Sequence, residues 1–301
     1  MAFKADRLRV LAGSIEAAAG TAETLDATDA TNPAFNVTWA DNTAYNIREN
    51  HEGGKLQGRR GALIGQIGFD IEARGLAATG AVPDWADRFL PACGYVKSTA
   101  TFTRTRVVAN QKTVTLESFI DGQYRRIYGA AGNVQLVYNA GQRSFFRFNF
   151  TGIVDPVEEA TNLDPTLITV QPILGAATFT YNSVTMKAPT ATLDFGCTVA
   201  PIESVGASGY ERFCISDYNP TLSVEPYAEA QSVVDFDADW TNNAERALSL
   251  VLGSSANNII TIAATKGSQN APPGFGERNR LTTRVISLDI NDDAAPTIVF
   301  S

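Results

Sequence analysis

The chain has 301 residues, of which 44% are hydrophobic and 19% charged, a composition typical of a globular protein and unlike that of a disordered one. Its net charge of −8 at pH 7 disfavours nucleic-acid binding, because Lys and Arg contacts to phosphate supply most of that affinity. No apolar run reaches the roughly 20 residues of a membrane-spanning helix, and no signal-peptide core is evident, so we expect a protein kept in a cytoplasm.

The charge is divided unevenly between the two halves of the chain. Residues 1–150 carry 17 basic and 14 acidic side chains, a net of +3, whereas residues 151–301 carry 7 and 18, a net of −11. This asymmetry fits a solvated acidic face, and it equally fits an assembly in which opposite ends or faces meet.

The first clear elements are a polar loop and a long strand. Residues 46–60 (NIRENHEGGKLQGRR) are polar and Gly-rich, which predicts a long loop. Its candidate functional residues are Glu49, His51, Glu52, Lys55, Arg59 and Arg60. Residues 61–75 (GALIGQIGFDIEARG) alternate with period two, which predicts a strand with one wet side. Its apolar face holds Leu63, Ile67, Phe69 and Ile71, and its polar face holds Gln66, Asp70 and Glu72.

A short helix and two hairpins are expected next. VPDWADRFLPACG (82–94) predicts a helix that begins near Pro83, presents Trp85 and Phe89 on one face and caps the open end of a sandwich. Asp121-Gly122 lies between two alternating runs, a strong hairpin signal. Residues 129–152 (GAAGNVQLVYNAGQRSFFRFNFTG) then predict a further pair of strands around an Ala-Gly turn.

The second half repeats the strand pattern. Residues 160–177 contain two prolines and are expected to cross in an extended form between structural halves of about 1–155 and 156–301, or within one β domain over 1–301. Six strand-length runs bounded by Gly, Pro, Asn or Asp follow, which suggests a sandwich or barrel. One of them carries Thr221, Ser223 and Glu225 on its polar side. Residues 267–280 are predicted to form a second long loop.

The sequence offers little for catalysis or metal binding. His51 is the only histidine, and it lies in a polar loop, so an ordinary solvated side chain is favoured over a catalytic triad. Asp235, Asp237 and Asp239 begin like a calcium loop, but Trp240 and Arg246 stand where a Gly and a bidentate Glu are needed, so we expect an acidic strand face. We therefore predict no catalytic, cofactor-binding or metal-binding residue.

Three cysteines, Cys93, Cys197 and Cys214, are too few and too scattered for a disulfide framework. Reduced and mostly buried thiols are favoured over a disulfide between Cys197 and Cys214, which stays open as an alternative.

Five stretches together resemble the tail tube (major tail) proteins of long-tailed bacteriophages. They are, in chain order, SIEAAAGTAETL, GQIGFDIEARG, PDWADRFLPACGY, DGQYRRIYGAAGNVQLVYNAGQRSFFRFNFTG and RFCISDYNPTLSVEP. The resemblance lies in their order and spacing and covers most of the chain. It implies a mainly β protein, a β-sandwich or barrel of tail-tube type with a short flanking helix and long inter-ring loops.

The same resemblance implies a structural function without enzymatic activity or cofactor. Six subunits would form a ring, and stacked rings would form the tube through which DNA is ejected without specific binding; because 301 residues is long for such a subunit, three copies of a doubled unit are the alternative. Expected partners are further copies of the chain, the tape measure protein, the tail terminator and baseplate or tail-tip proteins, with a sheath as well in the case of a contractile tail, and no membrane. The expected location is the virion tail, assembled in the cytoplasm of a bacterial host.

Within that scheme the polar strand faces have expected roles. The candidates for the lumenal wall are Gln66, Asp70, Glu72, Thr221, Ser223 and Glu225, and the loop of residues 46–60 is the candidate inter-ring arm. An acidic wall would repel DNA phosphates and so prevent sticking. Two other classes remain open: a carbohydrate- or surface-binding β-sandwich such as a virion decoration module or adhesin, and a β-rich hydrolase with two carboxylates.

Overall fold

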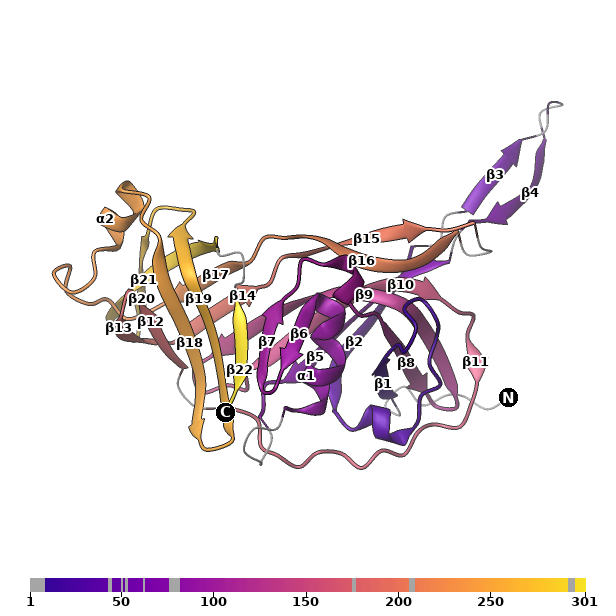
Figure 1. The fold of residues 1–301 in the computed structure, drawn as a ribbon, viewed down its shortest axis with the longest axis horizontal. Helices are drawn as coiled ribbons and strands as arrows, with labels where there is room; N and C mark the ends of the chain where they lie inside the picture. The colour runs from indigo at the N-terminus through magenta and orange to yellow at the C-terminus, as the bar shows by residue number, and fades with distance from the viewer. Residues whose placement is uncertain are drawn as a thin grey trace.

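Strands alternate with turns along nearly the whole chain (Figure 1). The computed structural model describes residues 9–42, 45–49, 51, 54–61, 63–75, 82–174, 177–205, 209–291 and 296–301. The first half contains β1 (Arg9–Ile15), β2 (Ala34–Asp41), β3 (Tyr45–Glu49), β4 (Lys55–Arg60), β5 (Ile64–Glu72), α1 (Asp84–Phe89), β6 (Tyr95–Ser98), β7 (Thr101–Arg104), β8 (Val114–Ile120), β9 (Gln123–Asn139), β10 (Phe145–Val154) and β11 (Glu158–Glu159). The second half contains β12 (Ala177–Tyr181), β13 (Val184–Ala188), β14 (Thr190–Asp194), β15 (Cys197–Glu203), β16 (Tyr210–Tyr218), β17 (Thr221–Glu225), α2 (Phe236–Thr241), β18 (Arg246–Ser255), β19 (Asn258–Gln269), β20 (Gly274–Arg278), β21 (Leu281–Ile290) and β22 (Thr297–Phe300).

One antiparallel sheet runs through both halves of the molecule. Its strand order is β2–β5–β10–β9–β14–β17–β21–β20. The 17-residue strand β9 is the link, because β10 pairs with one of its edges while β8 and β14 share the other. The first part of β9 thus belongs to a curled sheet with β8 and β1, and its last part carries the sheet on into the second half.

A second layer covers the apolar side of this sheet. In it β13, β12, β18, β19, β22, β7 and β6 pair in succession. The chain is therefore a mainly β protein with the layers of a β-sandwich, as predicted. Both described α-helices are six residues long, and no described helix is long and apolar enough to cross a membrane.

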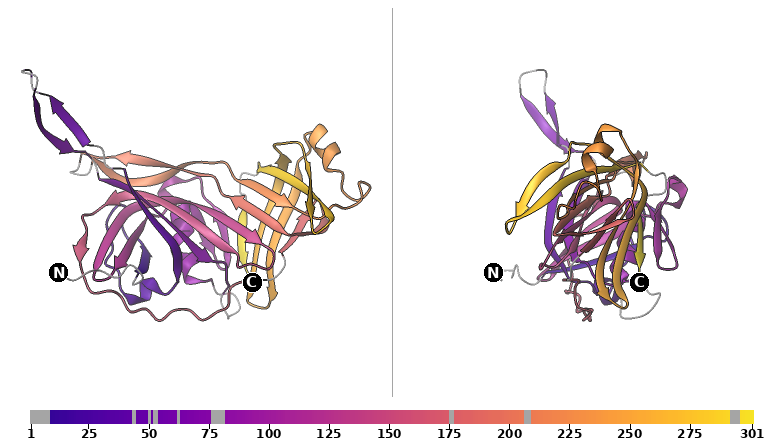
Figure 2. Two further views of the ribbon diagram at one scale, coloured as in Figure 1. Left: turned by 180° about the vertical axis from the view of Figure 1, so that it is seen from behind. Right: turned by 90° about the vertical axis from the view of Figure 1, so that its left-hand side faces the viewer.

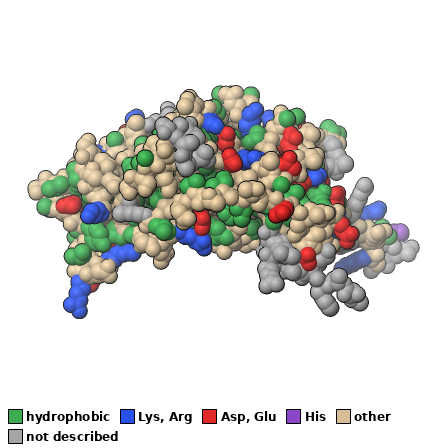
Figure 3. Space-filling model, turned by 90° about the horizontal axis from the view of Figure 1, so that it is seen from below, with side chains coloured by type: hydrophobic (Ala, Val, Ile, Leu, Met, Phe, Trp, Pro, Cys, Tyr) green, Lys and Arg blue, Asp and Glu red, His purple; other side chains and the backbone are tan. Residues whose placement is uncertain are grey.

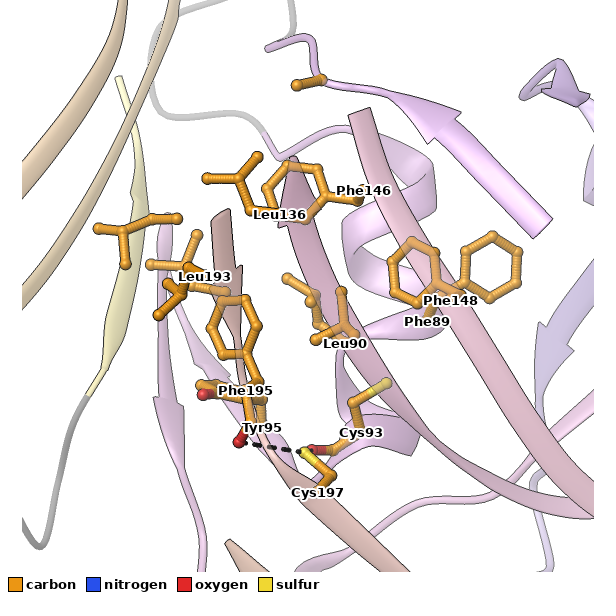
Figure 4. Close-up of a cluster of buried hydrophobic side chains, with 14 of the residues drawn as sticks. Phe89, Leu90, Cys93, Tyr95, Leu136, Phe146, Phe148, Leu193, Phe195 and Cys197 are labelled. Carbon is orange, nitrogen blue, oxygen red and sulfur yellow. Dashed lines mark hydrogen bonds between the residues drawn. The ribbon is translucent and has the colours of Figure 1, made fainter. Parts of the chain in front are cut away.

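Aromatic side chains dominate the core between the layers. Trp85 from α1 lies 4.6 Å from Phe146, and Phe89 lies 5.3 Å from Phe69, measured between ring centroids. Phe148 and Phe150 stack beside them at 5.9 Å. Figure 4 shows Phe89, Phe146 and Phe148 of this cluster and the continuation of the core toward the second half through Leu193, Phe195 and Cys197. Because residues from both halves share the cluster, one hydrophobic core spans them.

Several predicted elements are confirmed. The helix begins after Pro83 and ends at Phe89 with Leu90 as its C-cap, and a 3-10 turn (Pro91–Cys93) follows before Gly94 adopts φ +80°. The hairpin around Asp121-Gly122 joins β8 to β9. The two strands predicted within residues 129–152 pair as the end of β9 with β10.

Three predictions are wrong. Residues 46–60 are largely not a loop, since β3 and β4 pair as a hairpin that projects from the body (Figure 2). The end of β19 and all of β20 lie within 267–280. The acidic stretch around Asp237 is helix α2 rather than a strand, because the Asp235 carboxylate caps it by accepting a hydrogen bond from the Ala238 N–H at 2.9 Å.

The stretch that crosses from β11 to β12 has no helix or strand over residues 160–174 and runs along the outside of the molecule (Figure 1). Backbone hydrogen bonds hold it in place: the Ile168 N–H donates to the Thr31 carbonyl at 3.2 Å, and the Ile173 N–H donates to the Ala73 carbonyl at 2.9 Å. The crossing is thus fixed to the first half along its length.

Candidate functional site: a polar face shared by both halves

The candidate site is the outer face of the continuous sheet. Residues that pair directly in antiparallel register point to the same side. One row of such pairs crosses six strands, and its members are Asp70, Arg147, Gln135, Asp194, Thr221 and Asp289. A neighbouring row holds Glu72, Phe145, Val137, Thr192, Ser223 and Ser287. We call this side of the sheet the polar face.

The six residues predicted for a lumenal wall all lie on the polar face. Gln66 pairs with Thr151 and lies on the same side of β5 as Asp70 and Glu72. Glu225 pairs with Thr190 and lies two residues after Ser223, so it is on the same side of β17. The sequence placed the residues in two unrelated strands, and the pairing through β10, β9 and β14 brings them to one surface. Ser223 is exposed, whereas Asp70 is only 2% exposed.

Ion pairs neutralise the polar face over the first half. The Arg147 guanidinium donates to both oxygens of Asp70 at 2.9 and 3.3 Å, and the Asn36 amide adds a bond of 2.9 Å. The hydrogen bond to Asp70 raises the pKa of Arg147. Glu72 accepts from Arg143 at 2.9 Å. Asp70 is therefore a structural group that holds β5 to β10 and to the bulge in β2.

Over the second half, by contrast, the carboxylates on the polar face bind neutral donors. Asp194 accepts from the Asn133 amide and from the Gly196 N–H, each at 2.8 Å. Glu225 accepts from Thr283 at 2.5 Å and Asp289 from the Asn270 amide at 2.6 Å. These bonds orient the carboxylates but leave their charge uncompensated. The polar face is thus nearly neutral on one half and acidic on the other.

A hollow of about 510 Å³ opens on the polar face above Gly68. The hollow depends on the absence of a side chain at Gly68, since a Cβ there would lie 2.9 Å from the Thr38 hydroxyl. Its single carboxylate, Asp70, is already engaged by Arg147 and Asn36. Among the described residues no group of three or more His, Cys, Asp or Glu side chains is placed to hold a metal ion.

The candidate arm residues lie on the projecting β3–β4 hairpin. Glu49 and Lys55 face each other across it, and Arg60 pairs with Tyr45. His51 is exposed in the turn, Arg59 lies in β4 with only its backbone described, and Glu52 lies outside the described residues. The hairpin escaped prediction because both of its faces are polar, so the period-two signal of a half-buried strand is absent.

All three cysteines are free thiols. Cys197 pairs in register with Tyr218, whereas Cys214 lies opposite Ala200, so the two are not bonded. Burial raises the pKa of the Cys197 thiol to about 12, and its Sγ lies 3.4 Å from the Cys93 carbonyl oxygen (Figure 4). The cysteines are therefore packing residues, as favoured from the sequence.

One buried carboxylate was not singled out from the sequence. Glu16, 2% exposed, accepts four hydrogen bonds: from the N–H groups of Gly20 (2.7 Å) and Gly129 (2.6 Å), and from the hydroxyls of Thr113 (2.5 Å) and Thr115 (3.0 Å). It ties the segment after β1 to β8 and to the bend in β9. Three of its four partners lie about a hundred residues away, so no local pattern reveals them.

No protein-family model matches the chain, and no curated protein matches it in sequence. The distribution of charged side chains on the surface also bears on nucleic-acid binding. Figure 3 shows acidic and basic side chains interspersed over a largely neutral surface on the side that it presents. Such a surface lacks the concentrated basic stripe on which nucleic-acid binding relies.

Proposed function

We propose that the protein is a structural subunit that assembles with its own copies into stacked rings, forming the hollow tail tube of a long-tailed bacteriophage. In this proposal the polar face lines the lumen through which DNA leaves. The observation that carries it is the continuity of this face from β2 to β20 across both halves. A wall, unlike an active site, needs an extended surface rather than convergent side chains.

The sheet ends support ring closure. Within the described residues β2 pairs only with β5, and β20 pairs only with β21. Open edges of this kind invite pairing with another chain, and natural proteins cover them. If β2 of one copy joins β20 of the next, a closed ring leaves neither of these two edges exposed.

The width of the sheet favours three copies in a ring over six. Eight strands spaced by about 4.8 Å and tilted by about 40° cover an arc of about 50 Å. Three copies would then close a wall about 50 Å across between backbones, and six copies one of about 100 Å. The narrower wall is closer to what a single DNA duplex needs, so the alternative of three doubled units is preferred.

The charges of the polar face also support passage of DNA. Asp194, Glu225 and Asp289 accept hydrogen bonds from neutral donors, whereas the guanidinium of Arg147 is engaged by Asp70. The three carboxylates would repel DNA phosphates, and the Arg147 guanidinium, already bound to Asp70, would attract them only weakly. The other partners would be the tape measure protein, the tail terminator and the baseplate or tail-tip proteins, as the resemblance implies, with a sheath only in a contractile tail. The location would be the virion tail.

Electron microscopy of the concentrated, purified protein tests the proposal. We expect rings or tubes, with three copies in a ring. Protein that stays monomeric at every concentration and salt would refute it and would favour the surface-binding β-sandwich instead. Replacing Asp194 and Asp289 with Lys should preserve the tubes but slow DNA release from particles that carry the variant.

A further inference from the structure

Arg74, two residues after the end of β5, is a buried cation with little to balance its charge. Its side chain is 2% exposed. Its hydrogen bond runs from Nη1 to the Ile168 carbonyl at 3.4 Å, which is long for such a bond. Burial lowers the pKa of Arg74, and the Glu72 carboxylate opposes this effect. A buried charge is unfavourable unless it is paired and hydrogen-bonded, so the guanidinium calls for an anion.

Two nitrogens of Arg74, Nε and Nη2, have no hydrogen-bond partner among the described residues. They lie on one edge of the guanidinium and form a fork that matches two oxygens of a carboxylate or a phosphate. Arg147 presents this same edge to Asp70, with distances of 2.9 and 3.3 Å from Nε and Nη2. Arg246 presents it to Asp239, with distances of 3.2 and 2.6 Å. The fork of Arg74 is therefore suited to the ligand that the other two arginines bind.

The neighbouring sequence supplies no carboxylate for this fork. Glu72, two residues earlier, already accepts from Arg143 at 2.9 Å. Residues 75–83 (GLAATGAVP) contain no acidic side chain. Because Arg74 is almost fully buried, a small ion can reach it with less disturbance of the fold than the side chain of another protein. The ligand that fits is thus a small free oxyanion.

The guanidinium lies beneath the crossing of residues 160–174. The Ile168 N–H donates to the Thr31 carbonyl at 3.2 Å, while the Ile168 carbonyl accepts from Arg74. The crossing has neither helix nor strand there, so few backbone hydrogen bonds hold it down. Segments of this kind open locally at a lower free energy than the strands of a core. Local opening of the crossing therefore gives a small ion access to Arg74.

Three parts of the molecule meet beside this site. Gly75 donates its N–H to Oδ1 of Asn258, the first residue of β19, at 2.7 Å. The Nδ2 of Asn258 donates in turn to the Gln171 carbonyl of the crossing at 3.3 Å. An ion held at Arg74 would thus lie where the first half, the crossing and the second half are joined.

We propose that Arg74 binds a small oxyanion, a phosphate or a free carboxylate, beneath the crossing. Nε and Nη2 donate to two of its oxygens, as those of Arg147 do to Asp70. The ion enters when the crossing separates locally from Thr31, and once bound it holds the crossing closed. Binding to the folded chain alone stabilises the fold. The inference concerns a single chain and does not depend on the tube proposal.

Calorimetric titration of the full chain with inorganic phosphate, and separately with acetate, tests the site at constant ionic strength. We expect one ion to bind per wild-type chain and none to R74M, because methionine fills the space without a donor. R74K keeps the charge but lacks the fork, so its dissociation constant should rise by about tenfold or more. The matched control is R280M, which removes an exposed positive charge in the turn between β20 and β21 and should bind like the wild type. A wild type that binds neither ion refutes the inference, and so does an R74M variant that binds as tightly as the wild type.

Thermal unfolding provides a second measurement and shows whether the variants fold. In chloride, R74M should melt no lower than the wild type, because an apolar side chain replaces an unpaired buried charge. At a phosphate concentration about 100 times the dissociation constant, the wild type should gain about 4 °C more than R74M. Equal gains would show only the general stabilising effect of phosphate on folded proteins and would refute the inference.

Hydrogen exchange locates the ion. Phosphate should slow exchange of the Ile168 N–H in the wild type and leave it unchanged in R74M, because the bound ion keeps the crossing closed. If phosphate binds but exchange along the crossing does not change, the position beneath the crossing is wrong.

Discussion

Replacing Glu16 with glutamine tests how much one buried carboxylate contributes to this fold. Each of its oxygens accepts one backbone N–H and one threonine hydroxyl, and the side chain is 2% exposed. In the glutamine variant an NH₂ group replaces one oxygen. The threonine hydroxyl on that side can rotate to accept a hydrogen bond from the NH₂ group. The backbone N–H of Gly20 or Gly129 can only donate, so it is left facing another donor.

The expected cost follows from that single mismatch. A hydrogen bond to a charged group contributes about 1.5–3 kcal/mol, and a buried N–H without a partner adds to the loss, so we expect E16Q to lower the free energy of unfolding by about 3 kcal/mol. For a domain of this size the melting temperature would fall on the order of 6 °C. Urea unfolding followed by Trp fluorescence, with the buried Trp85 as a reporter, measures the change.

The control is E23Q, a less buried carboxylate in the same segment. Its side chain accepts one hydrogen bond in an exposed position, from the Ala17 N–H at 2.6 Å, so its loss should cost under about 1 kcal/mol. If E16Q is no more destabilising than E23Q, the four bonds to Glu16 do not stabilise the fold as argued.

Three further substitutions probe the core and the titration of the fold. F148A removes a fully buried ring between α1 and the sheet, and it should cost about 3–5 kcal/mol in urea unfolding; a cost under 1 kcal/mol would contradict the core described above. Y218F deletes a buried hydroxyl that donates to the carbonyls of Gly94 and Thr105. We expect the free energy of unfolding in the same assay to fall by about 1–2 kcal/mol, and no change would show that these hydrogen bonds do not stabilise the fold. Burial raises the pKa of Glu117, so its ionisation destabilises the folded state as pH rises from the ordinary glutamate value through the raised one. E117Q should flatten that part of the stability profile, and an unaltered slope would show that another group causes it.

The sequence predicted the elements whose signal is local. Helix α1 and the 3-10 turn after it begin at Pro83 and end at Gly94, within a dozen residues. The end of β9 and β10 alternate cleanly on either side of a short turn. In both cases one face is buried, so the hydrophobic pattern follows the structure. Such elements are determined by residues that lie close together in the chain.

What the sequence did not predict depends on distant pairing or on polar surfaces. The two polar sets around Asp70 and Ser223 become one face only through the pairing of β9 with β14, which joins segments about fifty residues apart. The β3–β4 hairpin buries neither face, and α2 is only six residues long and is capped by the Asp235 side chain. Tertiary contacts and a cap decide these elements, and neither leaves a periodic pattern.

The crossing of residues 160–174 has a consequence for how such a subunit can be encoded. The two halves are held together by the pairing of β9 with β14 and of β7 with β22, and by aromatic contacts such as that between Trp85 and Phe300. The covalent connection raises the effective concentration of one half near the other but adds little to their fit. A single backbone cut in the crossing would leave the shared sheet in place. The same architecture is therefore open to gene fission: two polypeptides, expressed together, would rebuild what one chain now makes.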